Sequence, residues 1–149
     1  MPSALVRALT ERMNLPIIDE TSVDAFLACG AGEADHTIIF FTGDPAQRSE
    51  ANDVAVVLPE ILRTFQGKLR GAVVRRGTED KLKSRFHVVI MPSLVVMRGS
   101  EIMGILPKIR DWSEYMTSIS AWLAPDAAPM TPPTPQKVEI NYAGERING

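Results

Sequence analysis

The chain has 149 residues, of which 45% are hydrophobic and 23% charged, a balance typical of one folded domain with a short segment left over. Its formal net charge of −2 disfavours nucleic acid as a partner, and no apolar run approaches the roughly 18 residues needed to span a bilayer. The single cysteine, Cys29, excludes a disulfide framework. Residues 1–13 are amphipathic and mixed in charge, unlike an export signal, so a cytoplasmic location without membrane insertion is expected.

Apolar periodicity predicts that helices and strands alternate in the first half of the chain. A first helix is predicted to follow Ser3 as its cap, because Leu5, Ala8, Leu9 and Met13 recur at helical spacing, and residues 15–18 are predicted to be extended. A second helix is predicted to begin at Thr21, where Asp24 completes a pattern that resembles a capping box. The uninterrupted apolar run Thr37–Thr42 then predicts a central strand that is covered on both faces.

The second half of the chain continues this alternation. A long helix containing Pro59 is followed by a strand over residues 69–74, which is expected to run parallel to the first buried strand because a helix connects them. The remaining predicted elements are a helix over residues 78–85, a hairpin of residues 93–97 and 101–105, and a helix over residues 112–123. This order predicts an α/β fold in which a central mixed β-sheet is flanked by helices.

The last predicted helix carries two further expectations. Asp111 and Glu114 are placed as a capping pair at its start. Its apolar stripe is expected to face the core and consists of Trp112, Tyr115, Met116, Ile119 and Leu123.

The composition changes at Pro125. Prolines recur there at positions 125, 129, 132, 133 and 135, and a polar end rich in asparagine and glycine follows. Such a segment offers little apolar surface to bury, which is the usual condition for remaining disordered. The folded domain is therefore expected to cover residues 1–124, and residues 125–149 are expected to form a disordered, proline-rich tail.

Three local features, together with the order of elements, resemble thioredoxin over residues 15–124. The buried strand leads through a loop into a helix with an internal proline, Met91-Pro92 precedes a hairpin strand where thioredoxins have a cis-proline, and an amphipathic helix ends the domain. The resemblance implies a thioredoxin-like fold with a cis bond at Pro92. Aligned on Pro59, residues 51–54 (Ala-Asn-Asp-Val) stand where thioredoxins carry Cys-x-x-Cys. Because dithiol exchange needs two thiols within reach, redox inactivity is expected.

A cysteine-poor family is more similar than thioredoxin itself: the hydrogenase expression/formation accessory proteins of the HupG/HyaE type. The segments that carry this resemblance are residues 15–20 (LPIIDE), 24–27 (DAFL), 42–45 (TGDP), 84–86 (SRF), 104–106 (GIL) and 111–112 (DW). The resemblance implies a non-catalytic chaperone in the maturation of uptake NiFe hydrogenase. It also implies the partners, namely the small-subunit precursor with its twin-arginine signal peptide, bound before export, or another hydrogenase accessory protein.

Candidate partner-binding residues lie in two places. The carboxylates of Asp44, Glu50 and Asp53 make the loop and helix start after the buried strand acidic. The simpler interpretation is a solvated loop with acids that favour a helix N-terminus, and the functional interpretation is an acceptor for paired arginines, which bind carboxylates bidentately. Met91 and Pro92 are expected to shape the sheet edge, and the resembled fold also presents this edge to extended peptides.

Other chemistry-bearing residues form no recognisable site. Cys29 has no basic neighbour in sequence to activate its thiol, His36 and His87 are far apart in the chain, and Ser49 and Ser93 lack a recognisable base. No catalytic residue, metal or cofactor is therefore expected. Two alternatives stay open, namely a glutathione- or other small-molecule-dependent enzyme on the same fold, using Ser49 or Cys29, and a structural subunit of an assembly.

The lone thiol generates a prediction about chemistry. With no second thiol to resolve a mixed disulfide, the protein should not catalyse reduction of insulin disulfides by dithiothreitol. Cys29→Ser should leave hydrogenase maturation intact in cells that depend on this chain. Dithiol-type turnover, or lost maturation with the fold preserved in the serine variant, would contradict the redox-inactive interpretation.

Overall fold

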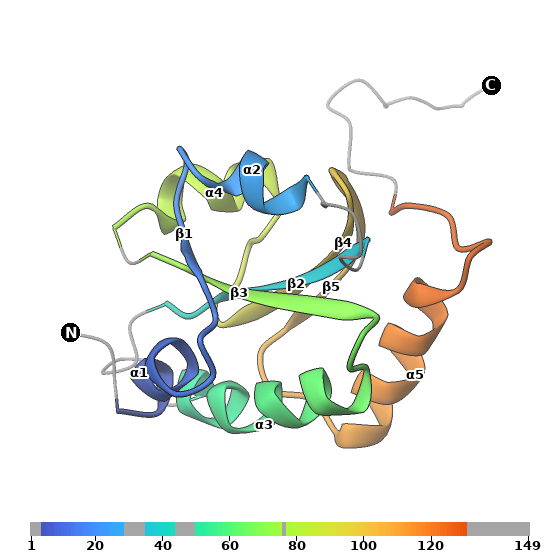
Figure 1. The fold of residues 1–149 in the computed structure, drawn as a ribbon, viewed down its shortest axis with the longest axis horizontal. Helices are drawn as coiled ribbons and strands as arrows, with labels where there is room; N and C mark the ends of the chain where they lie inside the picture. The colour runs from blue at the N-terminus through green and yellow to red at the C-terminus, as the bar shows by residue number, and fades with distance from the viewer. Residues whose placement is uncertain (1–3, 29–34, 44–49, 76, 131–149) are drawn as a thin grey trace, which may run out of the picture.

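A mixed five-stranded sheet with helices on both faces forms the centre of the computed structural model, which describes residues 4–28, 35–43, 50–75 and 77–130 (Figure 1). The strand order is β1-β3-β2-β4-β5. The strands are β1 (Ile17–Ile18), β2 (His36–Phe41), β3 (Leu69–Val74), β4 (Ser93–Arg98) and β5 (Glu101–Pro107). Strand β2 pairs in parallel with β3 and antiparallel with β4, while β4 and β5 form an antiparallel hairpin. This is the thioredoxin-like α/β architecture expected from the sequence.

The helices are divided between the two faces of the sheet, as Figure 1 shows. One face is covered by α1 (Ala4–Glu11), α3 (Glu50–Thr64) and α5 (Trp112–Leu123), and the other by α2 (Val23–Leu27) and α4 (Glu79–Arg85). None of the helices in the described ranges has the length and apolar character needed to cross a membrane.

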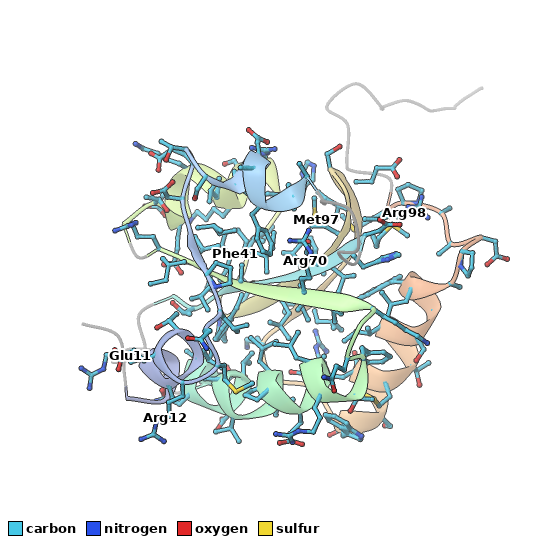
Figure 2. The ribbon with its side chains drawn as sticks, in the orientation of Figure 1. Glu11, Arg12, Phe41, Arg70, Met97 and Arg98 are labelled. Carbon is cyan, nitrogen blue, oxygen red and sulfur yellow. The ribbon has the colours of Figure 1, made fainter. Side chains whose placement is uncertain are left out.

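Strand β2 supplies side chains to both cores. Ile38 and Phe40 pack with the residues of α3 and α5, whereas Ile39 and Phe41 pack with those of α2 and α4. In Figure 2, Phe41 lies on the same side of the sheet as Met97 of β4, which belongs to the same core. The continuous apolar run therefore reflects burial on both faces, as predicted.

The predicted capping pairs do not form. The N-cap of α2 is Ser22 rather than Thr21, and its side chain makes no capping hydrogen bond. Instead the Asp19 carboxylate accepts hydrogen bonds from the backbone N–H groups of Thr21 and Ser22. At α5, Asp111 occupies the N-cap position, but its side chain makes no capping bond either. At the start of α2, the Asp19 carboxylate thus takes the place of Asp24, the acceptor that the capping box predicted.

The prediction of the apolar stripe of α5 is wrong in part. Tyr115 and Ile119 are fully buried, but Trp112 is 45% exposed. Trp122, which the predicted stripe omits, packs against Gly104 of β5, where a Cβ atom would lie 2.0 Å from the indole Cζ2. The absence of a side chain at Gly104 is therefore what lets this indole approach the sheet.

Residues beyond α5 return to the sheet. The N–H of Met130 donates to the Ile102 carbonyl at 2.7 Å, and the Arg98 guanidinium donates to the Ala127 carbonyl at 2.9 Å. Ala127 also packs against the core between the sheet and helices α3 and α5. Contacts with the domain thus continue past the expected boundary at residues 124/125, while residues 131–149 lie outside the described part.

The contact between Gly104 and Trp122 predicts an unequal response to two glycine substitutions. Gly104→Ala should lower the free energy of unfolding by about 2–4 kcal/mol, because a rigid indole or the strand must move. Gly71→Ala is the matched control, since its Cβ would lie 3.0 Å from a terminal methyl of Leu62, which can rotate away, and should cost about 1 kcal/mol or less. Urea denaturation of both variants measures this, and equal losses would contradict the assignment.

Candidate functional site

The turn before β4 contains a cis peptide bond between Met91 and Pro92, as predicted from the resemblance to thioredoxin. Because Phe41 pairs with Ser93, the end of β2 lies directly beside this turn. Pro92 is buried, and its carbonyl accepts a hydrogen bond from the Lys108 N–H at 2.7 Å. Proline has no N–H to donate. A peptide bound at this turn would therefore find its main-chain partners in the neighbours of Pro92.

Glu79 holds the start of the loop that follows β2. This carboxylate comes from the first turn of α4 and is only 6% exposed. Its Oε2 accepts a hydrogen bond from the Gly43 N–H at 3.0 Å and lies 3.2 Å from the Thr42 hydroxyl. Sequence reasoning missed this residue, because an acid at the start of a helix ordinarily signals only a favourable interaction with the helix dipole.

The predicted acidic residues are described only in part. Glu50 and Asp53 lie in the first turn of α3, where Glu50 is partly exposed and Asp53 is exposed. Asp44 lies outside the described residues. Three positions apart on a helix, the two carboxylates share one face. Within the described ranges, neither side chain has an ion-pair or hydrogen-bond partner. They are thus accessible to a cationic group from another molecule.

A shallow apolar hollow lies next to the cis-proline turn. It encloses about 220 Å³ and is lined by His87, Val89, Ile90, Ser93, Ile105 and Pro107. Val89 is 89% exposed and Ile90 43% exposed, although both are large apolar side chains. Clustered apolar exposure of this kind marks contact surfaces more often than scattered single residues do.

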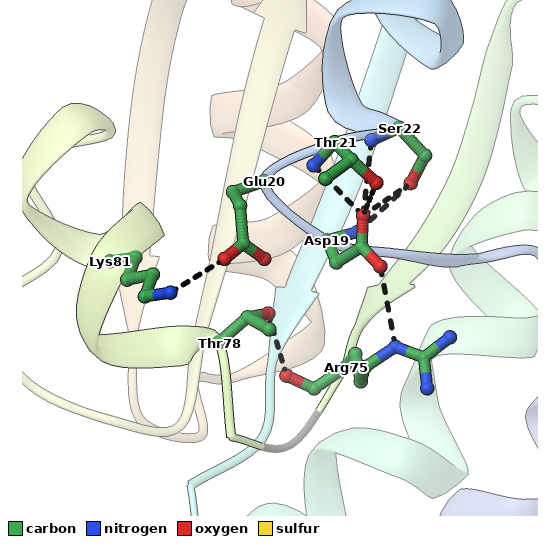
Figure 3. Close-up of polar contacts among 7 residues, drawn as sticks. All are labelled: Asp19, Glu20, Thr21, Ser22, Arg75, Thr78 and Lys81. Atoms are coloured by element: carbon green, nitrogen blue, oxygen red, sulfur yellow. Dashed lines mark hydrogen bonds and ion pairs between the residues drawn. The ribbon is translucent and has the colours of Figure 1, made fainter.

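A polar cluster joins the segment after β1 to the end of β3 and to α4 (Figure 3). Hydrogen bonds from Thr21, followed by those from Ser22, lower the pKa of Asp19 to about 2. Its second carboxylate oxygen lies 3.4 Å from Nε of Arg75, and Lys81 pairs with Glu20 at 2.8 Å. These contacts join the segment before α2 to α4, so the cluster has a structural role.

The two histidines do not form a site. His36 begins β2, and His87 follows α4 with a positive φ of 59°. Burial, and then the charge of Arg98, lower the pKa of His36, which favours its neutral imidazole. Among the described residues, no group of three or more His, Cys, Asp or Glu side chains is arranged to hold a metal ion. Cys29 and Ser49 lie outside those residues.

Comparison with known proteins points to one family. The family model described as "Hydrogenase-1 expression protein HyaE" matches residues 5–115. A hydrogenase expression/formation protein HupG of Rhizobium leguminosarum bv. viciae is 65% identical over 147 residues, covering 99% of both chains. A hydrogenase expression/formation protein HoxO of Azotobacter vinelandii is 34% identical over 120 residues, covering 80% of this chain and 78% of the relative.

A solved structure agrees with these relatives. The crystal structure of a putative hydrogenase expression/formation protein hupG from Rhodopseudomonas palustris is 41% identical, with a TM-score of 0.52. The match covers 72% of this chain and 94% of that protein.

The buried bonds to Glu79 predict that this acid is needed for stability. Glu79→Ala would leave the Gly43 N–H buried without the acceptor it now has, which should cost about 1–3 kcal/mol. Asp80→Ala is the matched control, because the next residue of the same helix is 88% exposed and forms only a surface ion pair with Lys83, so the change should stay within about 0.5 kcal/mol. Chemical denaturation compares them, and an equally small effect at both positions would show that the loop does not depend on Glu79.

Proposed function

Since the chain belongs to the HyaE family of hydrogenase expression proteins, we propose that it is a non-catalytic chaperone for the small-subunit precursor of an uptake NiFe hydrogenase. The proposed ligand is the twin-arginine signal peptide of that precursor, bound in the cytoplasm before export. Its relatives bear names of hydrogenase expression/formation proteins, so a role in hydrogenase maturation follows from family membership. The proposal adds to this role the identity of the bound segment, the signal peptide.

The observation that carries the proposal is the pair of unpartnered carboxylates at the start of α3. Glu50 and Asp53 share a helix face and have no partner within the described residues. A guanidinium is planar and donates two parallel hydrogen bonds to a carboxylate, so two neighbouring acids suit two neighbouring arginines. The positive end of the helix dipole offsets part of this attraction, which favours weak, reversible binding over permanent attachment.

The cis-proline turn supplies the second contact. The end of β2 leads into the acidic loop and lies beside Met91 and Pro92, so one extended peptide can reach both features. Exposed Val89 and Ile90 add apolar surface next to the turn. With no Cys-x-x-Cys motif in the chain, binding by main-chain pairing and charge needs no covalent step.

The proposal predicts that reversing the acidic charges weakens binding. Glu50→Lys with Asp53→Lys should reduce affinity for the synthetic signal peptide by between a few-fold and a few-hundred-fold, since each pair lost is worth at most about 1 kcal/mol if exposed and about 1.5–3 kcal/mol if desolvated. The loss should shrink as salt is raised. Replacing both peptide arginines by lysine should also weaken binding, because an ammonium cannot make the bidentate contact. Isothermal titration calorimetry measures all three effects.

A charge-matched control separates site from net charge. Asp80→Lys with Glu114→Lys changes the net charge equally, at exposed carboxylates of α4 and α5, and should leave affinity within about threefold. If the Glu50/Asp53 variant bound as tightly as the parent at low salt, the start of α3 would not be the arginine site.

A further inference from the structure

Helix α4 ends in a turn at which glycine is the usual residue. The Val88 N–H donates to the Lys83 carbonyl at 2.8 Å, and the His87 N–H donates to the Ser84 carbonyl at 3.3 Å. These are the two bonds of a Schellman motif, in which the first residue beyond the C-cap has the left-handed conformation and is most often glycine. His87 occupies this position with a φ of 59°. A residue with a Cβ atom adopts that conformation at a cost in free energy, because the Cβ crowds the following carbonyl oxygen.

The turn itself gives no reason for a histidine. Both of its hydrogen bonds come from main-chain groups, and the apolar contact of the motif is made by Val88, which is buried with Leu82 in the core that α2 and α4 cover. Glycine would supply the same bonds without the conformational cost. The end of α4 therefore requires the left-handed backbone of His87 but not its imidazole.

The imidazole belongs instead to the apolar hollow beside the cis-proline turn. His87 is half-buried and lines this hollow, in which the other polar side chain is Ser93. The Ser93 hydroxyl is buried and donates to the Ile90 carbonyl, so its proton is already engaged. Within the described part of the chain, the His87 side chain has no hydrogen-bond or ion-pair partner. Its ring nitrogens, which can donate or accept a hydrogen bond, thus border an otherwise apolar surface.

A second left-handed residue lies at the same turn. Lys108 has a φ of 62°, and its N–H donates to the Pro92 carbonyl. Among the described non-glycine residues only His87, Lys108 and Asn14 have a positive φ, and Asn14 precedes β1 at the other edge of the sheet. Backbone strain of this kind concentrates where ligands bind, because there a particular side chain must be held in a set position.

We propose that His87 contacts the bound peptide: its imidazole hydrogen-bonds the peptide main chain, while an apolar side chain of the peptide packs on Val89 and Ile90. An extended chain presents N–H and C=O groups at every residue, and an imidazole nitrogen can pair with either. This inference rests on the proposed function and narrows its ligand. The bound segment is an extended peptide that carries an apolar residue in addition to its arginine pair.

NMR of the histidine rings tests this contact directly, because the chain has only two histidines. Adding unlabelled signal peptide to the isotope-labelled full-length protein should shift the Hε1 resonance of His87. His36 is the internal reference, since it pairs with Arg98 at the opposite end of β2 from Phe41, and its resonance should stay in place.

Two glycine substitutions measure what the side chain contributes. His87→Gly should weaken peptide binding by about threefold to tenfold in isothermal titration calorimetry, as expected for one lost hydrogen bond. Its urea midpoint should be equal to or higher than that of the parent, because glycine suits the turn. Asn14→Gly is the matched control, which makes the same kind of change at a φ of 57° beside β1 and should leave affinity within about twofold.

Other outcomes overturn the inference. Peptide binding without a shift at His87, or with equal shifts at both histidines, means that the imidazole does not touch the peptide, while the proposed function stands. Unchanged affinity of His87→Gly has the same meaning, and a lowered urea midpoint in that variant means that the imidazole stabilises the fold instead. If the parent protein does not bind the signal peptide, the proposed function and this inference are both wrong.

Discussion

The burial of β2 on both faces determines where everything else lies. Thr37 to Phe41 are all fully buried, so helices must cover both sides of the sheet at its centre. Since β3 runs parallel to β2 and β4 antiparallel, one end of the sheet collects the ends of β2 and β3 and the start of β4. The loop after β2, the cis-proline turn and the start of α4 meet at that end for this reason. Glu79 fixes this junction through the Gly43 N–H.

The same junction is where a dithiol would act in the resembled fold, yet Ala51 and Val54 here are buried helix residues. In the function proposed above, an extended chain binds beside the cis-proline turn, and its arginines contact the acids at the start of α3. Binding through main-chain groups and charge tolerates the loss of the thiol pair. A thioredoxin-like domain can in this way serve as a recognition module once its redox residues are replaced by apolar ones.

Much of the fold follows from the sequence, because long apolar runs and helical stripes reflect burial directly. Helix α5 and strand β3 have the predicted bounds, and β2 begins and ends one residue earlier than predicted. What failed depends on contacts between distant elements. Trp112 and Trp122 are both compatible with an apolar helix stripe. Only the space left by Gly104 on strand β5 decides that Trp122 packs against the sheet. The capping box predicted at Thr21 failed because Asp19 accepts a hydrogen bond from the Thr21 N–H, which Asp24 was expected to bind. Glu79 looked like an ordinary first-turn acid, and its burial is decided by Thr42 and Gly43 across the sheet end.

The unequal environments of the two tryptophans make them separate optical reporters. Trp112 is 45% exposed, so its fluorescence should be quenched by iodide, whereas the indole of Trp122 lies against the backbone of Gly104. A single Trp112→Phe replacement leaves an emitter that senses the contact between α5 and β5. The complementary Trp122→Phe leaves one that senses solvent at the start of the same helix. Unfolding and ligand binding can thus be followed from two ends of α5 without attaching a dye.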